Sequence, residues 1–455
     1  MRSTALPLLL ALTASCASLP GGAPRRAPNV VLIVTDDQGY GDLSCQGHPT
    51  LHTPHLDALA AGGAKLTQFY VASPVCSPSR AALLTGCYPK RVGMHEHVIF
   101  PPYDYGLHTD EVTLADLLRA QGYATGCFGK WHLGHRPGLL PTDQGFDEFY
   151  GVPYSNDMAQ FHRKEGNGYE FRLPLMRDAE VIEWEPDQRY LTRNSTGEAV
   201  DFIERNADRP FFAYVPYSMP HIPLYASEEF DGTSPRGLYG DVIEEIDAGV
   251  GALVAALERH GLREDTLILF TSDNGPWLQF KRDGGTAGSL RGGKGTNWEG
   301  GQRVPLIASW PDAIPAGLVS REVVTALDVL PTIAALVGAE LPAVTLDGHD
   351  VAGLLRGEAL RSPTDAFLYY TSKGKLAAIR RGPWKLHLES GELYHVEHDI
   401  SEKWDVAEQH AELIAELRAE ATARDADVTA GARPVRTVTE TVFDPRRPEA
   451  EAEGL

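Results

Sequence analysis

Cysteine is scarce in this chain, with five among 455 residues. Small exported domains that depend on disulfides are dense in cysteine, so a disulfide scaffold is disfavoured and a chain of this length must rely on a hydrophobic core. Beyond Cys16, the remaining four are Cys45, Cys76, Cys87 and Cys127. They lie close enough along the chain to permit a bridge, but nothing in their spacing requires one.

Basic residues are fewer than acidic residues. Lys and Arg number 41 against 62 Asp and Glu, which gives a formal net charge of −21. Nucleic-acid binders need Lys/Arg-rich surfaces to neutralise phosphates, so we expect no nucleic-acid partner. Apolar content of 43% and charged content of 23% exclude disorder of the whole chain. The length predicts roughly two to four domains.

The apolar run at the N-terminus, residues 5–14, is too short to span a membrane. It follows one Arg and precedes small residues, which is typical of a secretory signal. Cleavage after Ala17 would release a soluble protein, whereas cleavage before Cys16 would leave a cysteine for lipidation, because Leu12–Cys16 resembles a bacterial lipoprotein box. We predict a signal peptide over 1–17, a Pro/Gly-rich linker over 18–28, and a bacterial protein that is periplasmic, secreted or lipid-anchored. Any membrane contact would come only through that anchor.

Short β-branched runs alternate with amphipathic helical segments over residues 29–345. Strands are expected at 29–35, 210–216 and 265–272, and helices at 113–121, 242–260 and 325–337. This alternation predicts an α/β domain whose large central sheet is mostly parallel and flanked by helices. Shorter strands at 366–371, 375–380, 384–388 and 392–395, then a helix at 406–422, predict a smaller antiparallel sheet plus helix over 346–425. We expect the tail, 426–455, to be loosely packed.

Polar pairs follow two of the predicted buried strands. Asp36-Asp37 comes directly after the first strand, and Asp273-Asn274 comes after the strand at 265–272. Ligands of open α/β sheets lie at the carboxyl ends of strands, and an oxygen-only donor set suits Ca²⁺ or Mg²⁺. Acidic residues also follow strands simply because they favour turns, so spacing alone leaves both interpretations open.

A second candidate site is the segment from Cys76 to Gly86. Cys76, Pro78 and Arg80 precede an apolar stretch, as in a loop that opens a helix, and Arg80 would lie in the first turn, where backbone N–H groups favour an anion. A buried structural cysteine is the alternative.

Cys76-Ser-Pro78-Ser-Arg80, followed by Ala-Ala-Leu-Leu-Thr-Gly86, resembles the signature of the type I sulfatases, in particular the arylsulfatase A-like group of the alkaline-phosphatase-like superfamily. Further segments match this family in the expected order, at residues 36–42, 129–134, 219–225, 272–275 and 290–305. The resemblance runs from about residue 29 to 310, and it identifies 29–345 as a catalytic domain.

The resemblance implies that a formylglycine-generating maturation enzyme oxidises Cys76 to an aldehyde. It also implies one Ca²⁺ ion, which residue 76 would hold together with Asp36, Asp37, Asp273 and Asn274. Mg²⁺ could bind to the same donors. One hydroxyl of the hydrated aldehyde would attack sulfur, Asp273 would take its proton, and sulfate would remain covalently on residue 76.

The remaining matched residues also acquire roles through the resemblance. His132 would remove the second hydroxyl's proton and so release sulfate, while His221 with Lys294 would protonate the departing oxygen. Arg80 and Lys130 would hold the sulfate and the aldehyde-derived oxygens. Taken singly, each of these histidines and cations is more often a structural or surface residue.

We therefore expect a sulfatase that hydrolyses aryl sulfates or sulfated carbohydrates, with the alcohol portion selected by loops at 93–108, 154–190 and 276–290. A phosphomonoester or phosphonate hydrolase of the same superfamily is the near alternative. An inactive protein that binds sulfated glycans is a second, if Cys76 stays unmodified. A phosphate loop at 288–294 is rejected, because Gly295 stands where Ser or Thr would bind Mg²⁺.

Overall fold

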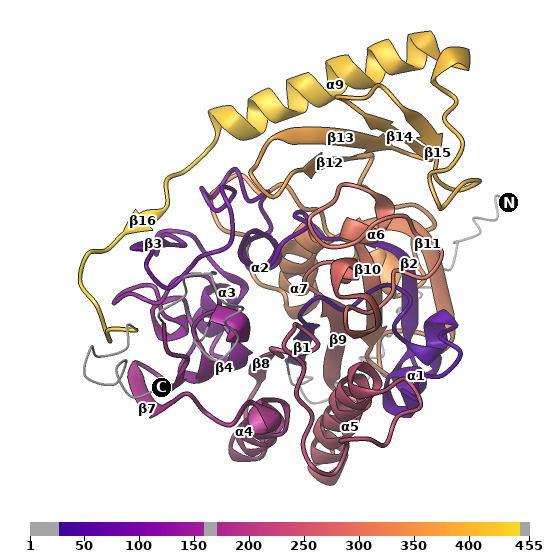
Figure 1. Cartoon of the computed structure of the whole chain (residues 1–455). Helices are drawn as coiled ribbons and strands as arrows, with labels where there is room; N and C mark the ends of the chain where they lie inside the picture. The colour runs from indigo at the N-terminus through magenta and orange to yellow at the C-terminus, as the bar shows by residue number, and fades with distance from the viewer. Residues whose placement is uncertain (1–26, 159–170, 446–455) are drawn as a thin grey trace, which may run out of the picture.

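The computed structural model describes residues 27–158 and 171–445. The predicted signal peptide, with Cys16, lies outside these ranges, as does most of the predicted linker. The described chain forms a large sheet covered by helices and a smaller sheet crossed by one long helix (Figure 1).

The large sheet has ten strands in the order β11-β2-β10-β9-β1-β8-β4-β5-β6-β7. Its central strands β9, β1, β8, β4 and β5 run parallel, whereas β10, β6 and β7 pair antiparallel with their neighbours. The strands are β1 (Asn29–Thr35), β2 (Ala64–Tyr70), β4 (Ala124–Lys130), β5 (Glu148–Val152), β6 (Pro174–Arg177), β7 (Glu180–Trp184), β8 (Phe211–Pro216), β9 (Thr266–Ser272), β10 (Arg303–Ser309) and β11 (Leu318–Thr325). The predicted α/β class with a mostly parallel sheet is confirmed.

Helices cover both faces of this sheet. One face carries α1 (Pro54–Ala61), α4 (Leu191–Arg205) and α5 (Leu238–Arg259), and the other carries α2 (Cys76–Thr85), α3 (Leu114–Ala120) and α7 (Val329–Val337). Every residue of β1 and β9 is buried, because these strands lie between two hydrophobic cores. Uninterrupted apolar runs are the expected sequence of such doubly covered strands. The short helices α6 (Glu299–Gln302) and α8 (Ala352–Leu355) lie in connections.

The smaller sheet is antiparallel and pairs β12 (Ala366–Tyr370), β13 (Leu376–Arg381), β14 (Trp384–His387) and β15 (Leu393–His395) in chain order. Figure 1 places it between the main body and α9 (Ala411–Ala430), which lies across its outer side. The predicted strands match within one or two residues. The predicted helix at 406–422 is displaced, because residues 407–409 form a separate 3-10 turn and the Ala-rich segment continues the helix to Ala430.

The segment after α9 contacts the main body at separate points up to residue 445, and the rest of the predicted tail, 446–455, lies outside the described residues. Arg433 forms an ion pair with Glu111, with Nε 2.6 Å from Oε1. Strand β16 (Arg436–Thr437) pairs with β3 (Tyr105–Gly106), and the Phe443 ring lies 5.7 Å from that of Trp184. These contacts are an ion pair, a short strand pairing and a single aromatic contact. None of them requires a periodic pattern of apolar residues, so nothing in the sequence indicated them.

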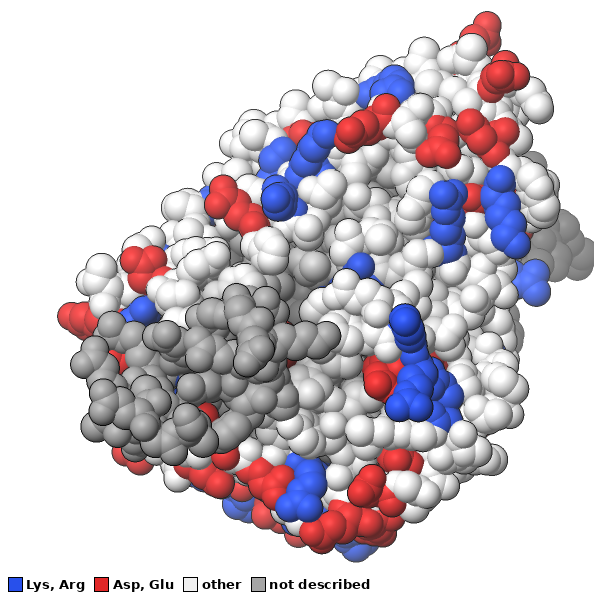
Figure 2. All heavy atoms as spheres, viewed as in Figure 1, with Lys and Arg blue, Asp and Glu red and all other residues white. Residues whose placement is uncertain are grey.

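The surface is mixed in charge. On the face in Figure 2, Asp and Glu side chains lie interspersed with Lys and Arg, mostly toward the periphery. Cys45, Cys76, Cys87 and Cys127 are all free thiols, so the described chain uses no disulfide. Among the described residues, no helix combines the length and the apolar character needed to cross a bilayer.

Candidate active site

The two polar pairs predicted at strand ends are neighbours in space. Strands β1 and β9 pair in parallel, with Thr35 opposite Ser272, so both pairs emerge at the same edge of the sheet. The Asp37 N–H donates to Asp273 Oδ1 at 3.2 Å, and Asn274 Nδ2 donates to Asp37 Oδ1 at 2.7 Å. Asp37 adopts a positive φ of 64°, a strained backbone conformation of the kind that concentrates at functional sites.

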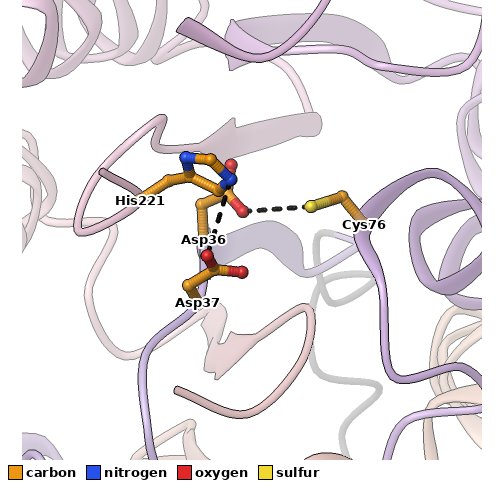
Figure 3. Close-up of side chains that lie close together, drawn as sticks. All are labelled: Asp36, Asp37, Cys76 and His221. Atoms are coloured by element: carbon orange, nitrogen blue, oxygen red, sulfur yellow. Dashed lines mark hydrogen bonds and ion pairs between the residues drawn. The ribbon is translucent and has the colours of Figure 1, made fainter. Parts of the chain in front are cut away.

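Cys76 is the first residue of α2, and it faces the same edge. Its Sγ lies 3.4 Å from Asp36 Oδ1, and His221 Nε2 lies 3.5 Å from Asp37 Oδ2 (Figure 3). Potential ligand atoms of Asp36, Asp37, Cys76 and His221 all lie within 4.8 Å of one another, and all four residues are buried. A buried cluster of this composition could hold a metal ion.

Asn274 adds an independent indication of a cation. Its Oδ1 is buried and has no hydrogen-bond partner in the described chain. A buried acceptor without a partner is costly, and a hard cation at this position would satisfy it. Asp273 lies outside the four-residue cluster: its Oδ2 accepts from Arg80 Nε at 2.8 Å, and its Oδ1 accepts from Asp37.

Three cations surround the carboxylates. Lys130 Nζ lies 2.5 Å from Asp36 Oδ2, and Lys294 Nζ lies 2.8 Å from Asp37 Oδ2 and 3.7 Å from Cys76 Sγ. Arg80 is fully buried and pairs with Asp273. The site therefore places three cations, each paired with a carboxylate, around the cysteine, in a molecule whose formal net charge is −21.

The pKa values of the two buried carboxylates are shifted in opposite directions. Burial alone would raise the pKa of Asp36, but Lys130, His221, Arg80 and Lys294 together hold it well below its ordinary value. Burial raises the pKa of Asp273, and the charge on Asp36 raises it further. Environments that separate the pKa values of two neighbouring carboxyls are typical of catalytic sites.

The thiol of Cys76 is poorly suited to act as a nucleophile itself. Burial, followed by the charge of Asp36, raises its pKa well above the ordinary value. The thiolate is the reactive form of cysteine, so this residue is protonated at neutral pH and unreactive as it stands.

His132 is arranged as a neutral base. Its Nε2 lies 3.0 Å from the Ile99 carbonyl oxygen, which assigns the proton to Nε2 and leaves a lone pair on Nδ1. That Nδ1 is buried and has no partner in the described chain. Burial, Lys130 and Arg80 hold the pKa of His132 well below its ordinary value, so the ring is uncharged. Its φ of 64° is a second strained position at the site.

A cavity of about 240 Å³ opens onto these residues. Its polar lining includes Cys76, His132, His221 and Lys294, and its apolar lining includes Val98, Phe100, Met158 and Trp277. Lys294 Nζ lies 4.2 Å from the centre of the Trp277 ring, and the His221 ring lies 5.3 Å from it.

The structure brings the sequence-predicted site residues together: Asp36, Asp37, Cys76, Arg80, Lys130, His132, His221, Asp273, Asn274 and Lys294. Sequence reasoning did not single out Ser155 and Asp157, which line the same cavity. Both lie in a loop predicted to select the alcohol portion, but neither belongs to a recognisable motif.

Comparison with known proteins agrees with this geometry. A family model described as Sulfatase matches residues 28–339. The chain is 44% identical to human arylsulfatase A over 400 residues, covering 84% of this chain and 77% of the relative. It is 38% identical to mouse N-acetylgalactosamine-6-sulfatase over 406 residues, covering 85% and 76%.

A solved structure shares nearly the whole fold. The crystal structure of Ps i-CgsB in complex with k-i-k-neocarrahexaose superposes with a TM-score of 0.79 at 32% identity, covering 94% of this chain and 96% of that one. The family model thus covers residues 28–339, and the relatives align with more than four-fifths of the chain. The chain belongs to the sulfatase family, whose members are hydrolases of sulfuric esters.

Proposed function

We propose that this protein is an exported, calcium-dependent sulfatase that acts through a formylglycine made from Cys76. The observation that carries the proposal is the setting of Cys76: its Sγ lies 3.4 Å from Asp36 Oδ1 and 3.7 Å from Lys294 Nζ. A protonated thiol in this position has no evident chemistry of its own, whereas an oxygen-bearing side chain there would face both a metal site and a sulfate site.

The proposed metal ligands are Asp36, Asp37, Asp273, Asn274 and the oxygen of residue 76. The unpartnered Oδ1 of Asn274 and the carboxylates of Asp36 and Asp37 form an oxygen-rich set that fits Ca²⁺, and Mg²⁺ suits similar donors. When bound, such a cation neutralises a sulfate oxygen and lowers the pKa of a nearby hydroxyl.

The surrounding side chains would bind the sulfate and transfer protons. Arg80 and Lys130 are fully buried and supply preorganised positive charge for the sulfate. Asp273, whose pKa is raised by burial, is suited to accept a proton, and the neutral His132 offers its free Nδ1 as a second base. His221 and Lys294 lie beside the cavity, where a departing oxygen would need a proton.

Maturation and export complete the proposal. The aldehyde requires a formylglycine-generating enzyme, which must act before folding buries Cys76, because that residue is only 1% exposed in the folded chain. The segment 1–17 would direct export, with Cys16 as the acceptor if the protein is lipid-anchored. The expected substrate is a sulfated glycan fragment or a small sulfate ester.

Turnover of 4-nitrophenyl sulfate and 4-nitrophenyl phosphate tests the reaction class. The matured protein should have the higher kcat/KM for the sulfate, and Cys76→Ala should abolish sulfate release while retaining the wild-type circular dichroism spectrum. A preference for the phosphate would favour the phosphomonoester hydrolase alternative. Undiminished turnover by Cys76→Ala would exclude any mechanism that depends on residue 76.

A further inference from the structure

A second cavity, of about 500 Å³, lies outside the active site and shares no lining residue with the active-site cavity. Its charged or titratable lining consists of Tyr40, His48, Arg236 and Arg303, and none of the described residues that line it is acidic. The chain has 62 acidic residues against 41 basic ones, so a cavity without a carboxylate is unusual for it. A cavity lined by basic side chains alone attracts anions.

Arg236 brings a positive charge that no carboxylate neutralises. Its guanidinium makes no hydrogen bond or ion pair within the described chain and lies 5.2 Å from the centre of the Tyr239 ring. Asp42, which follows the lining residue Gly41, is engaged elsewhere: it accepts from the Thr286 N–H at 2.9 Å and from the Tyr239 hydroxyl at 2.8 Å. Burial raises the pKa of Asp42 to about 7, which further reduces its negative charge at neutral pH.

Two neutral side chains add hydrogen-bond donors. His48 Nδ1 accepts from the N–H groups of Thr50 at 3.2 Å and Leu51 at 3.0 Å, which assigns the ring proton to Nε2. Burial and the charge of Arg236 lower the pKa of His48, so the ring keeps this uncharged form. Gln46 Nε2 is buried without a partner in the described chain. A buried donor without an acceptor is costly, and an anion in the cavity would supply one.

Arg303 holds the fourth donor group in a fixed position. Its Nε donates to the Thr67 carbonyl oxygen at 2.8 Å, and its Nη1 lies 3.4 Å from Glu299 Oε2. Glu299 also pairs with Lys385 and Arg380, so three cations share this carboxylate. The charge of Arg303 is therefore only partly neutralised by its neighbours.

We infer that this cavity binds a tetrahedral oxyanion, a sulfate or phosphate group, through four donor side chains: Gln46, His48, Arg236 and Arg303. Four oxygens can accept from donors that approach from several separate segments, as these do. None of the four takes part in the proposed reaction, so the cavity is a binding site of its own. Residues 40–41 follow the Asp36-Asp37 pair and residues 286–290 precede Lys294, so a bound ion would hold two active-site segments together.

Binding of radiolabelled sulfate, measured by equilibrium dialysis on the matured full chain, tests this site. The proteins are the wild type, Arg236→Gln and Gln46→Leu, with Arg321→Gln as the matched control, because Arg321 is exposed on β11 and does not line the cavity. The active site is also expected to bind sulfate. Inhibition of 4-nitrophenyl sulfate turnover by sulfate therefore serves as a separate readout of the active site.

The wild type should bind two sulfate ions per chain. Arg236→Gln should weaken one of the two about 10- to 100-fold, and Gln46→Leu about 3- to 10-fold, as expected for lost hydrogen bonds from a charged and from a neutral donor. The inhibition constant for sulfate should stay unchanged in both variants, and Arg321→Gln should change neither quantity. Competition by inorganic phosphate and by glycerol 3-phosphate then shows whether the site prefers a free ion or the same group on an organic molecule.

Three results would overturn the inference. The first is a wild type that binds a single sulfate per chain. The second is sulfate binding that neither Arg236→Gln nor Gln46→Leu weakens. The third is a parallel shift of the binding and inhibition constants, because it would place the ion in the active site. Sulfate binding that depends on Arg236, in a matured protein without sulfatase turnover, would instead contradict the proposed function and leave this site standing.

Discussion

At the scale of single residues, Asn274 is the most informative member of the proposed metal site. Its Nδ2 is engaged by Asp37 and by the Gly275 carbonyl oxygen, while its Oδ1 is buried without a partner in the described chain. The side chain is thus held in one orientation by its donor end. Its acceptor end is left available for a cation.

Calcium should stabilise the protein through this oxygen. A ligand that binds only the folded state adds about 2.7 kcal/mol at one hundred times its Kd, so Ca²⁺ should raise the Tm of metal-stripped protein. Asn274→Ala should lose most of that increase in differential scanning calorimetry. Asn29→Ala is the matched control, because Asn29 also has a buried, unpartnered Oδ1 but lies at the opposite end of β1 from Asp36.

The two asparagines separate a local metal effect from general destabilisation. Asn29→Ala is expected to lower the Tm through its lost hydrogen bond to Thr266, yet to keep the full calcium-dependent rise. If Asn274→Ala kept the same rise as Asn29→Ala, the assignment of Asn274 as a ligand would be wrong.

Residues within motifs could be predicted individually, whereas Asp157 could not. Asp36 and Asp273 follow strands whose apolar runs are clear in the sequence, and Cys76 lies in a distinctive signature. Asp157 lines the active-site cavity only because its loop folds beside the segment that carries His221. No local pattern of residues encodes that approach.

At the scale of elements, the small sheet is joined to the catalytic domain by buried charges. Lys385 on β14 lies 3.1 Å from Glu299 Oε1 of α6 and 2.9 Å from Glu402 Oε1. The Glu299 N–H in turn donates to Glu402 Oε2 at 2.7 Å. Because α6 begins five residues after Lys294, this cluster fixes one end of the loop that carries that catalytic candidate.

Glu299 is ionised at neutral pH. Burial would raise the pKa of Glu299, but Lys385, Arg380 and Arg303 hold it well below its ordinary value. A depressed carboxyl pKa contributes stability above the unfolded-state pKa, and that contribution is lost as the pH falls through the folded-state pKa. The attachment of the small sheet should therefore be intact at neutral pH and weaken in acid.

Removing the lysine should be costly. Lys385→Met leaves two buried carboxylates without their shared cation, which we expect to lower the free energy of unfolding by about 3–5 kcal/mol in urea denaturation at neutral pH. Lys375→Met is the matched control in the turn before β13: its ion pair with Glu389 joins two exposed side chains, so a change within about 1 kcal/mol is expected. Equal stability of the two variants would contradict a structural role for the cluster.

The elements themselves were predictable to different degrees. Three strands of the large sheet (β1, β8 and β9) and the four strands of the small sheet were predicted from apolar runs and turn residues, because burial on one or two faces leaves a clear pattern. The end of α9 and the segment beyond it could not be predicted, because Arg433, β16 and Phe443 contact the main body through isolated residues that leave no apolar pattern. The buried charge cluster around Glu299 could not be predicted from the sequence either, because its members are far apart along the chain.

At the scale of the whole molecule, the acidic excess of the chain is not repeated at the site, where three cations are matched by three carboxylates. The formal charge of −21 argues against a nucleic-acid partner, which stays a prediction from the sequence. Lys294 and His221 line the active-site cavity, and the buried Arg80 and Lys130 pair with carboxylates of the same site. Overall charge therefore says little about which anion a buried site accepts.

The chemical identity of residue 76 decides whether this site works as proposed. Mass spectrometry of the peptide that contains residue 76, isolated from the native host and treated with a hydrazide probe, distinguishes an aldehyde from a thiol. The account predicts an aldehyde at residue 76, with Cys45, Cys87 and Cys127 remaining as thiols that an alkylating agent labels after unfolding. An unmodified thiol at residue 76 in protein that actively releases sulfate would contradict it.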